Sequence, residues 1–254
     1  MNDPFRSTTL RLSLAVAACA LAVGCNALKP SAEAPKNEAK DDTNAAKPAD
    51  KVADKPVTPV AIEGKYSITG TNPAGTPYKG DLEIIKHADV FQFRWDAGKQ
   101  YDGVGVQQDG VVAVSFCEGQ DGKGCGVACY RVNADGTLEA RWGLWGTDDS
   151  GTEKATHSDG ASTLEGKYAV TGKSPKGTDY KATLTIAKTE GGYNLVWSTG
   201  DTGFGIVRGD HLTVGYGGPQ CGFVSYEAQA DGSLVGVWGG PGTNATGSET
   251  ATRK

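Results

Sequence analysis

The residues of this chain best suited to chemistry are its cysteines. Cys117, Cys125, Cys129 and Cys221 lie beyond the N-terminal region, and an exported chain can oxidise such thiols to disulfides. Cys117 and Cys129 have the same outward parity on strands expected to be neighbours, which predicts a Cys117–Cys129 disulfide across a hairpin. Cys125 and Cys221 occupy equivalent loops of two repeats and could join them. Zinc is a minor alternative, because the cysteine spacing is not a usual ligand pattern.

Acid–base chemistry has weaker candidates. His87, His157 and His211 fall at unrelated positions in the repeats, and neither a Gly-x-Ser-x-Gly elbow nor a His-Glu-x-x-His motif occurs. Glu153 and Glu249 are equivalent residues of the two repeats. They would act as acids only if they pointed into a cavity, and the favoured interpretation is a rim position, bonded to backbone donors or a lysine. The sequence therefore predicts a protein that is not an enzyme and has no cofactor and no metal.

Repeated aromatic residues offer a possible ligand cup. Such side chains could line a site for a small apolar or sugar ligand. A barrel of fewer than about 100 residues has little room for a cavity, so a filled core is the favoured expectation. The residues are Trp95, Trp142, Tyr66, Tyr78 and Tyr130, with counterparts Trp197, Trp238, Tyr168, Tyr180 and Tyr226.

One loop carries apolar residues where its counterpart carries turn residues. Gly143-Leu144-Trp145-Gly146 aligns with Gly239-Gly240-Pro241-Gly242. Trp is enriched where surfaces meet partners, so Leu144 and Trp145, with Asp148 and Asp149 beside them, are candidates for a binding tip. The alternative, slightly favoured, is that Trp145 folds back over the barrel mouth as a plug.

An internal repeat must position all of these residues. Ile62-Glu63-Gly64-Lys65-Tyr66 returns as Leu164-Glu165-Gly166-Lys167-Tyr168, and the two copies align from there almost to the C-terminus. Self-similarity of this kind indicates a repeated structural unit. We therefore expect two β-barrel domains, residues 62–157 and 158–254.

Each repeat contains eight short segments with period-two alternation, separated by turn residues such as Asp109-Gly110 and Asp135-Gly136. Eight sequential strands with one apolar face favour closure, which removes the sheet edges. The predicted fold is all-β, with two tandem antiparallel eight-stranded up-and-down meander barrels. Val104 and Val106 are assigned to the interior. Two open sheets packed as a sandwich are the runner-up.

Copy two has apolar residues on its outward parity. Val196, Val235 and Val237 stand where copy one has Arg94, Glu139 and Arg141. This difference predicts that the valines are covered, and the contact between repeats is the favoured cover.

The N-terminal region indicates export. Residues 1–24 have a short basic start and an apolar run too short to span a bilayer, as in a signal peptide. Residues 25–61 are rich in Ala, Lys, Pro and acidic residues, which predicts a disordered linker. Ala22-Val23-Gly24-Cys25 resembles the lipobox of bacterial lipoproteins, with Ala22 where Leu is usual. The resemblance implies a lipid on Cys25, and Asn26 after it implies outer-membrane sorting. Val16-Ala17-Ala18-Cys19 fits the same pattern but leaves a shorter apolar run.

The repeat itself resembles a small secreted bacterial β-repeat sometimes labelled fibronectin-binding. The frame in copy one is Gly64, Tyr66, Asn72, Pro73, Gly75, Tyr78, Trp95, Gly103, Gly105, Asp135, Gly136, Leu138 and Trp142. Copy two departs from it with Ser174 in place of Asn72. In layout the predicted barrels are similar to avidin-like and calycin barrels. The resemblance implies fold and envelope location rather than a ligand.

The charge balance restricts the partners. A net charge of -5 provides no basic field for nucleic acid. The favoured function is an envelope-anchored lipoprotein that serves as a non-catalytic binding or adhesion module for an envelope or extracellular protein. The alternative is a structural or accessory envelope protein without a small-molecule ligand.

Overall fold

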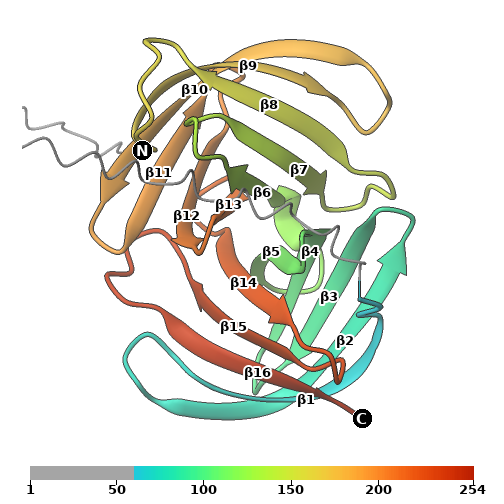
Figure 1. Ribbon diagram of the computed structural model, residues 1–254. Helices are drawn as coiled ribbons and strands as arrows, with labels where there is room; N and C mark the ends of the chain where they lie inside the picture. The colour runs from blue at the N-terminus through green and yellow to red at the C-terminus, as the bar shows by residue number, and fades with distance from the viewer. Residues whose placement is uncertain (1–59) are drawn as a thin grey trace, which may run out of the picture. The chain divides into compact units, whose positions relative to one another are not determined.

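The computed structural model describes residues 60–254, and these residues form two closed antiparallel barrels of eight strands each (Figure 1). The all-β barrel prediction is confirmed. The signal segment, Cys25 and nearly all of the linker lie outside the described residues, so the lipidation site stays a prediction. Within residues 60–254, no helix has the length and apolarity needed to cross a bilayer.

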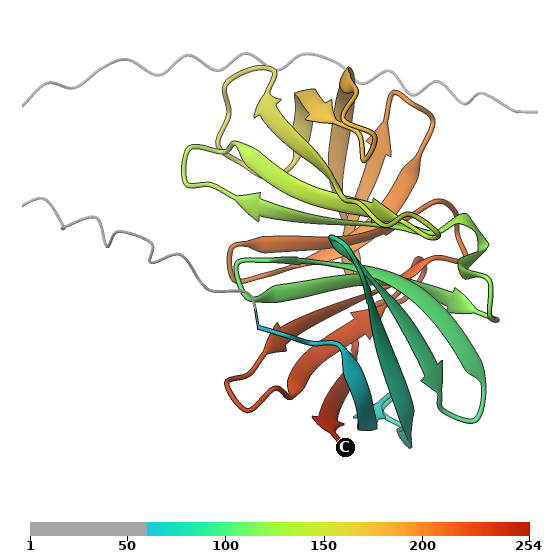
Figure 2. The same ribbon diagram turned by 90° about the vertical axis from the view of Figure 1, so that its right-hand side faces the viewer.

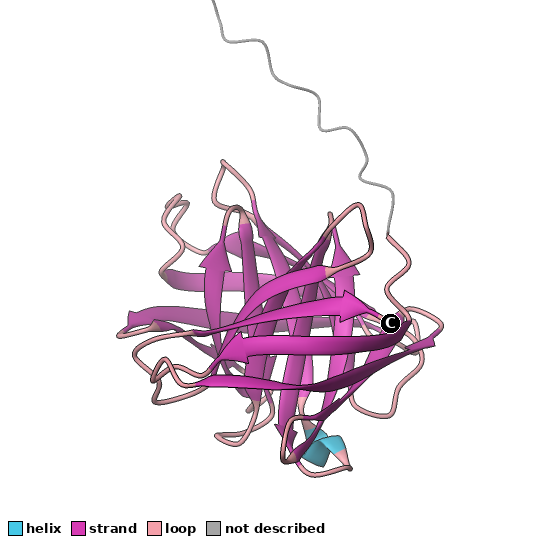
Figure 3. Cartoon of the chain, turned by 90° about the horizontal axis from the view of Figure 1, so that it is seen from below, coloured by secondary structure: helices cyan, strands magenta, loops and turns pink. Residues whose placement is uncertain are grey.

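The first eight strands come from repeat one. They are β1 (Gly64–Thr71), β2 (Pro77–His87), β3 (Val90–Asp96), β4 (Gln100–Gln108), β5 (Val111–Glu118), β6 (Gly126–Val132), β7 (Leu138–Leu144) and β8 (Gly151–His157). The 3-10 turn η1 (Gly122–Gly124) lies between β5 and β6 and is drawn in cyan in Figure 3.

The other eight strands come from repeat two. They are β9 (Gly166–Lys173), β10 (Asp179–Thr189), β11 (Gly192–Trp197), β12 (Thr202–Arg208), β13 (His211–Tyr216), β14 (Gly222–Ala228), β15 (Leu234–Gly239) and β16 (Gly247–Arg253).

The barrels do not follow the repeats. The first, which we call barrel A, closes in the order β1-β16-β15-β14-β5-β4-β3-β2, and barrel B closes in the order β10-β11-β12-β13-β6-β7-β8-β9. Each barrel therefore takes five strands from one repeat and three from the other, as the mixture of early and late colours in each barrel shows (Figure 2). The expectation that residues 62–157 and 158–254 each close their own barrel is wrong, because the chain crosses between barrels after β5 and returns after β13.

A disulfide joins the two crossings. Cys125 precedes β6, Cys221 precedes β14, and the two are bonded with their Cα atoms 5.7 Å apart. Cys117 packs in the same buried cluster, whereas Cys129 lies in the contact between barrels. The predicted Cys117–Cys129 bond is wrong because β5 and β6 do not form a hairpin: β5 pairs with β14, and β6 with β13. The suggested link between equivalent loops is the one that forms.

Where the barrels meet, the strands carry apolar residues on their outer faces, and these residues are buried by the contact. Val104 and Val106 of β4 lie there with Val127 of β6, and Gly143 of β7 lies so near that an added Cβ would be 2.9 Å from the Val90 side chain. The interior assignment of Val104 and Val106 is wrong. The inside of β4 is instead made by Gly103 and Gly105, where a Cβ would meet Trp95 and Phe93.

Polar groups complete this contact. Arg141 of β7 lies 3.1 Å from the Asp89 carboxylate, and the Gln108 side chain donates to the Glu139 carbonyl across the barrels. The predicted cover over Val196 and Val235 is wrong, since these side chains are 50% and 40% exposed. The apolar contact between the barrels is made by β4, β5 and β6, all from repeat one.

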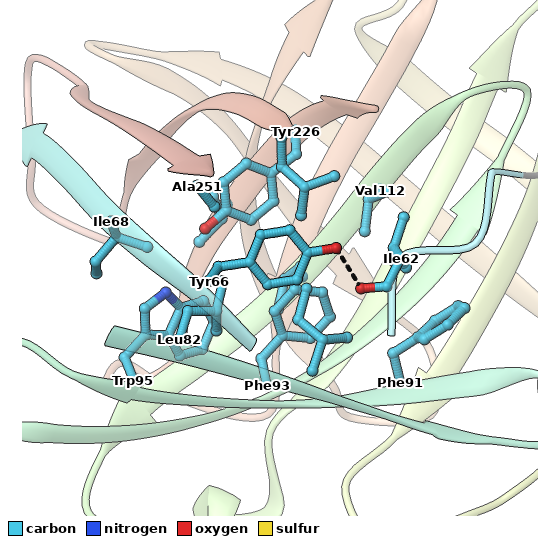
Figure 4. Packing of buried hydrophobic residues seen from close by; sticks show 14 residues of the cluster. Ile62, Tyr66, Ile68, Leu82, Phe91, Phe93, Trp95, Val112, Tyr226 and Ala251 are labelled. Atoms are coloured by element: carbon cyan, nitrogen blue, oxygen red, sulfur yellow. Dashed lines mark hydrogen bonds between the residues drawn. The ribbon is translucent and has the colours of Figure 1, made fainter. Parts of the chain in front are cut away.

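The repeated opening motif closes one end of each barrel. Tyr66 is fully buried and its hydroxyl donates to the Ile62 carbonyl at 2.7 Å (Figure 4), while Tyr168 donates to the Leu164 carbonyl at 2.9 Å. Gly64 adopts φ 141°, a backbone conformation that favours glycine. The spacing from Ile62 to Tyr66 thus allows a local hydrogen bond that closes this end of the barrel.

The disulfide should contribute strongly to stability. The cysteines are 96 residues apart, and cross-linking a loop of that length removes about 4.7 kcal/mol of entropy from the unfolded chain. Replacing both Cys125 and Cys221 by Ser should lower the free energy of unfolding by up to about that amount in denaturant titrations. A reducing agent should destabilise the native chain similarly and leave the double variant unchanged. A native chain insensitive to reduction would contradict this role.

Candidate functional site

The other end of each barrel holds a pocket. In barrel A the volume is about 310 Å³ and in barrel B about 300 Å³. Thr76 and Pro77 at the rim of the first, and Thr199 and Asp201 at the rim of the second, are exposed, so both pockets reach the surface. The expectation of completely filled barrels is wrong: the core fills only the end closed by Tyr66 or Tyr168.

A glutamate lies at the base of the barrel A pocket. Glu249 of β16 is 5% exposed and accepts a hydrogen bond from the Tyr78 hydroxyl at 2.6 Å and one from Trp95 Nε1 at 3.0 Å. The hydroxyl of the fully buried Tyr226 also donates to it. In Figure 4 the Tyr226 hydroxyl and the Trp95 indole nitrogen lie on the side of the core away from Ile62. The carboxylate is thus held by donors from three other strands.

Barrel B repeats this arrangement. Glu153 of β8 accepts from the Tyr180 hydroxyl at 2.8 Å and from the buried hydroxyl of Tyr130. The expectation of a rim position with backbone or lysine partners is wrong for both glutamates, because tyrosines and a tryptophan are the partners in the structure. The sequence does contain a sign of this network, because these glutamates and tyrosines recur at equivalent positions of the two repeats. Period-two alternation, however, does not reveal which donors meet inside a barrel.

The tyrosines remain protonated donors. Burial raises the pKa of Tyr226 well above its usual value, and the nearby Glu249 carboxylate raises it further. Burial and Glu153 act in the same way on the pKa of Tyr130. A phenol that keeps its proton can donate a hydrogen bond to an adjacent carboxylate. Each pocket base is therefore a carboxylate surrounded by neutral donors.

Aromatic rings form the walls. In barrel A a chain of ring contacts runs from Tyr78 to Trp238 (6.2 Å between centroids), Trp238 to Phe116 (6.0 Å), and Phe116 to both Trp95 (5.9 Å) and Tyr101 (6.0 Å). In barrel B, Trp142 contacts Tyr180 and Trp197 contacts Tyr216. We call each set of wall rings with its glutamate an aromatic cage.

Each cage also contains one buried indole donor. Trp238 Nε1 in barrel A and Trp142 Nε1 in barrel B are buried, and the two rings contact Tyr78 and Tyr180. Their indole edges lie over Gly247 and Gly151, where an added Cβ would be 2.5 Å from each nitrogen. The occurrence of this donor at the same place in both barrels adds to the equivalence of the two cages.

The candidate binding tip makes contacts within the chain. Trp145 is partly buried against the valine cluster between the barrels, and its ring lies over Gly122, where no Cβ would fit. The Asp148 carbonyl accepts from the Asp89 amide at 3.0 Å. Trp145 is therefore neither an exposed tip nor a plug in the mouth of its own barrel. Leu144 lines the barrel B pocket, and Asp149 remains exposed.

Other possible sites are less developed. A hollow of about 750 Å³, mainly on barrel B, is lined by lysines, carboxylates and smaller residues, with Tyr180 as its one ring. Among residues 60–254, no three His, Cys, Asp or Glu side chains are grouped to hold a metal ion. The aromatic cages combine enclosure with a glutamate, which is buried in barrel A and partly buried in barrel B.

Comparisons with known proteins add no relative: no family model, no curated protein and no solved structure matches the chain.

The Glu249 network should support the fold of barrel A. Replacing Glu249 with Leu removes the acceptor for Tyr78, Trp95 and Tyr226, and unpaired buried donors cost about 1–3 kcal/mol each. We expect a loss of about 3 kcal/mol in the free energy of unfolding, measured by denaturant titration. The exposed pair of Glu83 with Lys65 supplies the control, because Glu83→Gln should change stability by less than about 0.5 kcal/mol. Equal effects of the two substitutions would refute the network's role.

Proposed function

We propose that this protein is an envelope-anchored, non-catalytic binding protein that holds small molecules in the two aromatic cages. The observation that carries the proposal is the equivalence of the pockets. Tyr78, Trp95 and Glu249 correspond in the repeats to Tyr180, Trp197 and Glu153, and both sets surround a pocket of about 300 Å³. Such a volume lies at the small end of ligand sites.

The chemistry of the cages favours binding over catalysis. A general acid or base must exchange a proton with a reacting group, whereas Glu249 and Glu153 are occupied by tyrosine and tryptophan donors. Among the described lining residues, neither pocket includes a histidine, a cysteine or a lysine to serve as a nucleophile or base. The arrangement instead provides a rigid, preformed cavity, which reduces the entropy lost on binding.

The anchoring part of the proposal is supported by the sequence. The apolar N-terminal run and the lipobox-like Ala22-Val23-Gly24-Cys25 favour a lipid on Cys25, and Asn26 favours the outer membrane. The disulfide between Cys125 and Cys221 is compatible with an oxidising compartment. A lipid and a linker would hold two pockets near the membrane surface, where a second site increases retention of a ligand with two binding groups.

The function can be tested by retention of small molecules. The purified protein is mixed with the low-molecular-weight fraction of a cell extract, unbound material is removed, and retained molecules are identified by mass spectrometry. Ala97 and Ala182 line the two pockets, so a variant with both replaced by Trp should lose retention because the added rings occupy the cavities.

Ala134→Trp provides the matched control. Ala134 is exposed in the turn before β7 and lines neither pocket, so this variant should retain the same molecules as the native chain. Absence of any retained molecule, or equal retention by the filled variant, would contradict the proposed function.

A further inference from the structure

The base of each aromatic cage carries a negative charge without a positive partner in the cage. The donors to Glu249 are two tyrosine hydroxyls and an indole N–H, all neutral groups. Among the described residues, neither pocket lining contains a lysine, arginine or histidine. A carboxylate enclosed in this way keeps a net negative potential, because hydrogen bonds from neutral donors stabilise its charge without cancelling it.

Aromatic faces that meet a ligand add to that potential. The face of an aromatic ring is the negative end of its quadrupole, and cations bind against Trp and Tyr faces with about 0.5–2 kcal/mol per contact. In barrel A, five rings surround the pocket above Glu249: Tyr78, Trp95, Tyr101, Phe116 and Trp238. Aromatic rings around a single carboxylate are a combination that attracts a quaternary ammonium group, which has no N–H and therefore needs no hydrogen bonds to replace its hydration.

The rim of the barrel B pocket also favours a cation, because it carries an additional carboxylate. Asp201 stands at the position of Tyr101, and Tyr216 at the position of Phe116. Asp201 is exposed at the pocket mouth. Burial raises the pKa of Tyr216, and Asp201 and Glu153 raise it further, which keeps that ring neutral. The second pocket therefore has two carboxylates and again no cation in its lining.

We propose that both pockets bind small organic cations, with an alkylated ammonium group enclosed by the rings over Glu249 in barrel A and over Glu153 in barrel B. This assignment rests on the proposed small-molecule function and specifies its ligand class. The attraction is electrostatic and aromatic, so it depends on the charge of the ligand rather than on its shape.

A pair of probes separates charge from shape. Choline and its neutral carbon isostere 3,3-dimethyl-1-butanol have closely similar shapes but differ in charge. The protein is titrated with each probe while its indole N–H signals are followed by NMR. Trp95 and Trp238 report on barrel A and Trp142 and Trp197 on barrel B, while Trp145 lines neither of these two pockets and serves as an internal control.

Choline should shift the four cage signals, leave that of Trp145 unchanged, and bind at least about tenfold more tightly than the isostere. Glu249→Gln should weaken choline binding at Trp95 and Trp238 by about tenfold without changing the barrel B signals, which show that the variant is folded. If that variant does not fold, Phe116→Leu should weaken barrel A binding while preserving barrel B.

Two results would overturn the proposal in different ways. Equal or tighter binding of the isostere would show that the pockets bind small molecules but do not select cations. The proposed function would then be supported, and the assignment of the ligand class would be wrong. Absence of shifts from both probes would reject the cation assignment, and retention of extract molecules by the native chain but not by the filled variant would then decide separately whether the pockets bind at all.

Discussion

The structure depends on four ladders of hydrogen bonds that join strands of different repeats: β5 with β14 and β1 with β16 in barrel A, and β6 with β13 and β8 with β9 in barrel B. Each barrel is completed by the three strands that the other repeat supplies, and this closure leaves no sheet edge unpaired. The Cys125–Cys221 disulfide lies where the chain makes both crossings. The contact between barrels follows from the same exchange, because the crossing strands carry valines on their outer faces.

The aromatic cages are also built from residues of both repeats. Glu249 and Trp238 come from repeat two, whereas Tyr78 and Trp95 come from repeat one. Neither repeat alone therefore supplies the carboxylate and all of its donors to barrel A in this topology. Both pockets therefore depend on the integrity of the whole pair of barrels. The duplicated sequence thus yields two sites that differ mainly at the rim, where Tyr101 is replaced by Asp201.

The sequence predicted strand number, barrel closure and the repeated interior residues, because period-two alternation and turn residues are local signals. It did not predict the exchange of strands between repeats, because the two repeats supply equivalent strands that can pair in the same register. Val114 pairs with Val224 in this structure, and in an unexchanged barrel it would pair with Ala128, the counterpart of Val224 in repeat one. The inward glycines Gly103 and Gly105 reversed the apparent polarity of β4, so Val104 and Val106 were assigned to the wrong face. Glu249 was recognised as repeated, but its tyrosine and tryptophan partners come from strands distant in sequence and only the closed barrel brings them together.

The central claim is that each barrel is completed by the other repeat, and interstrand nuclear Overhauser effects measure this directly. The account predicts backbone contacts between the β5 segment around Val114 and the β14 segment around Val224, together with contacts between Ala128 and Val214. The differing side chains of Val224 and Ala128 make the two patterns distinguishable. Backbone contacts between Val114 and Ala128, with none between Val114 and Val224, would show that each repeat closes its own barrel and would contradict the account.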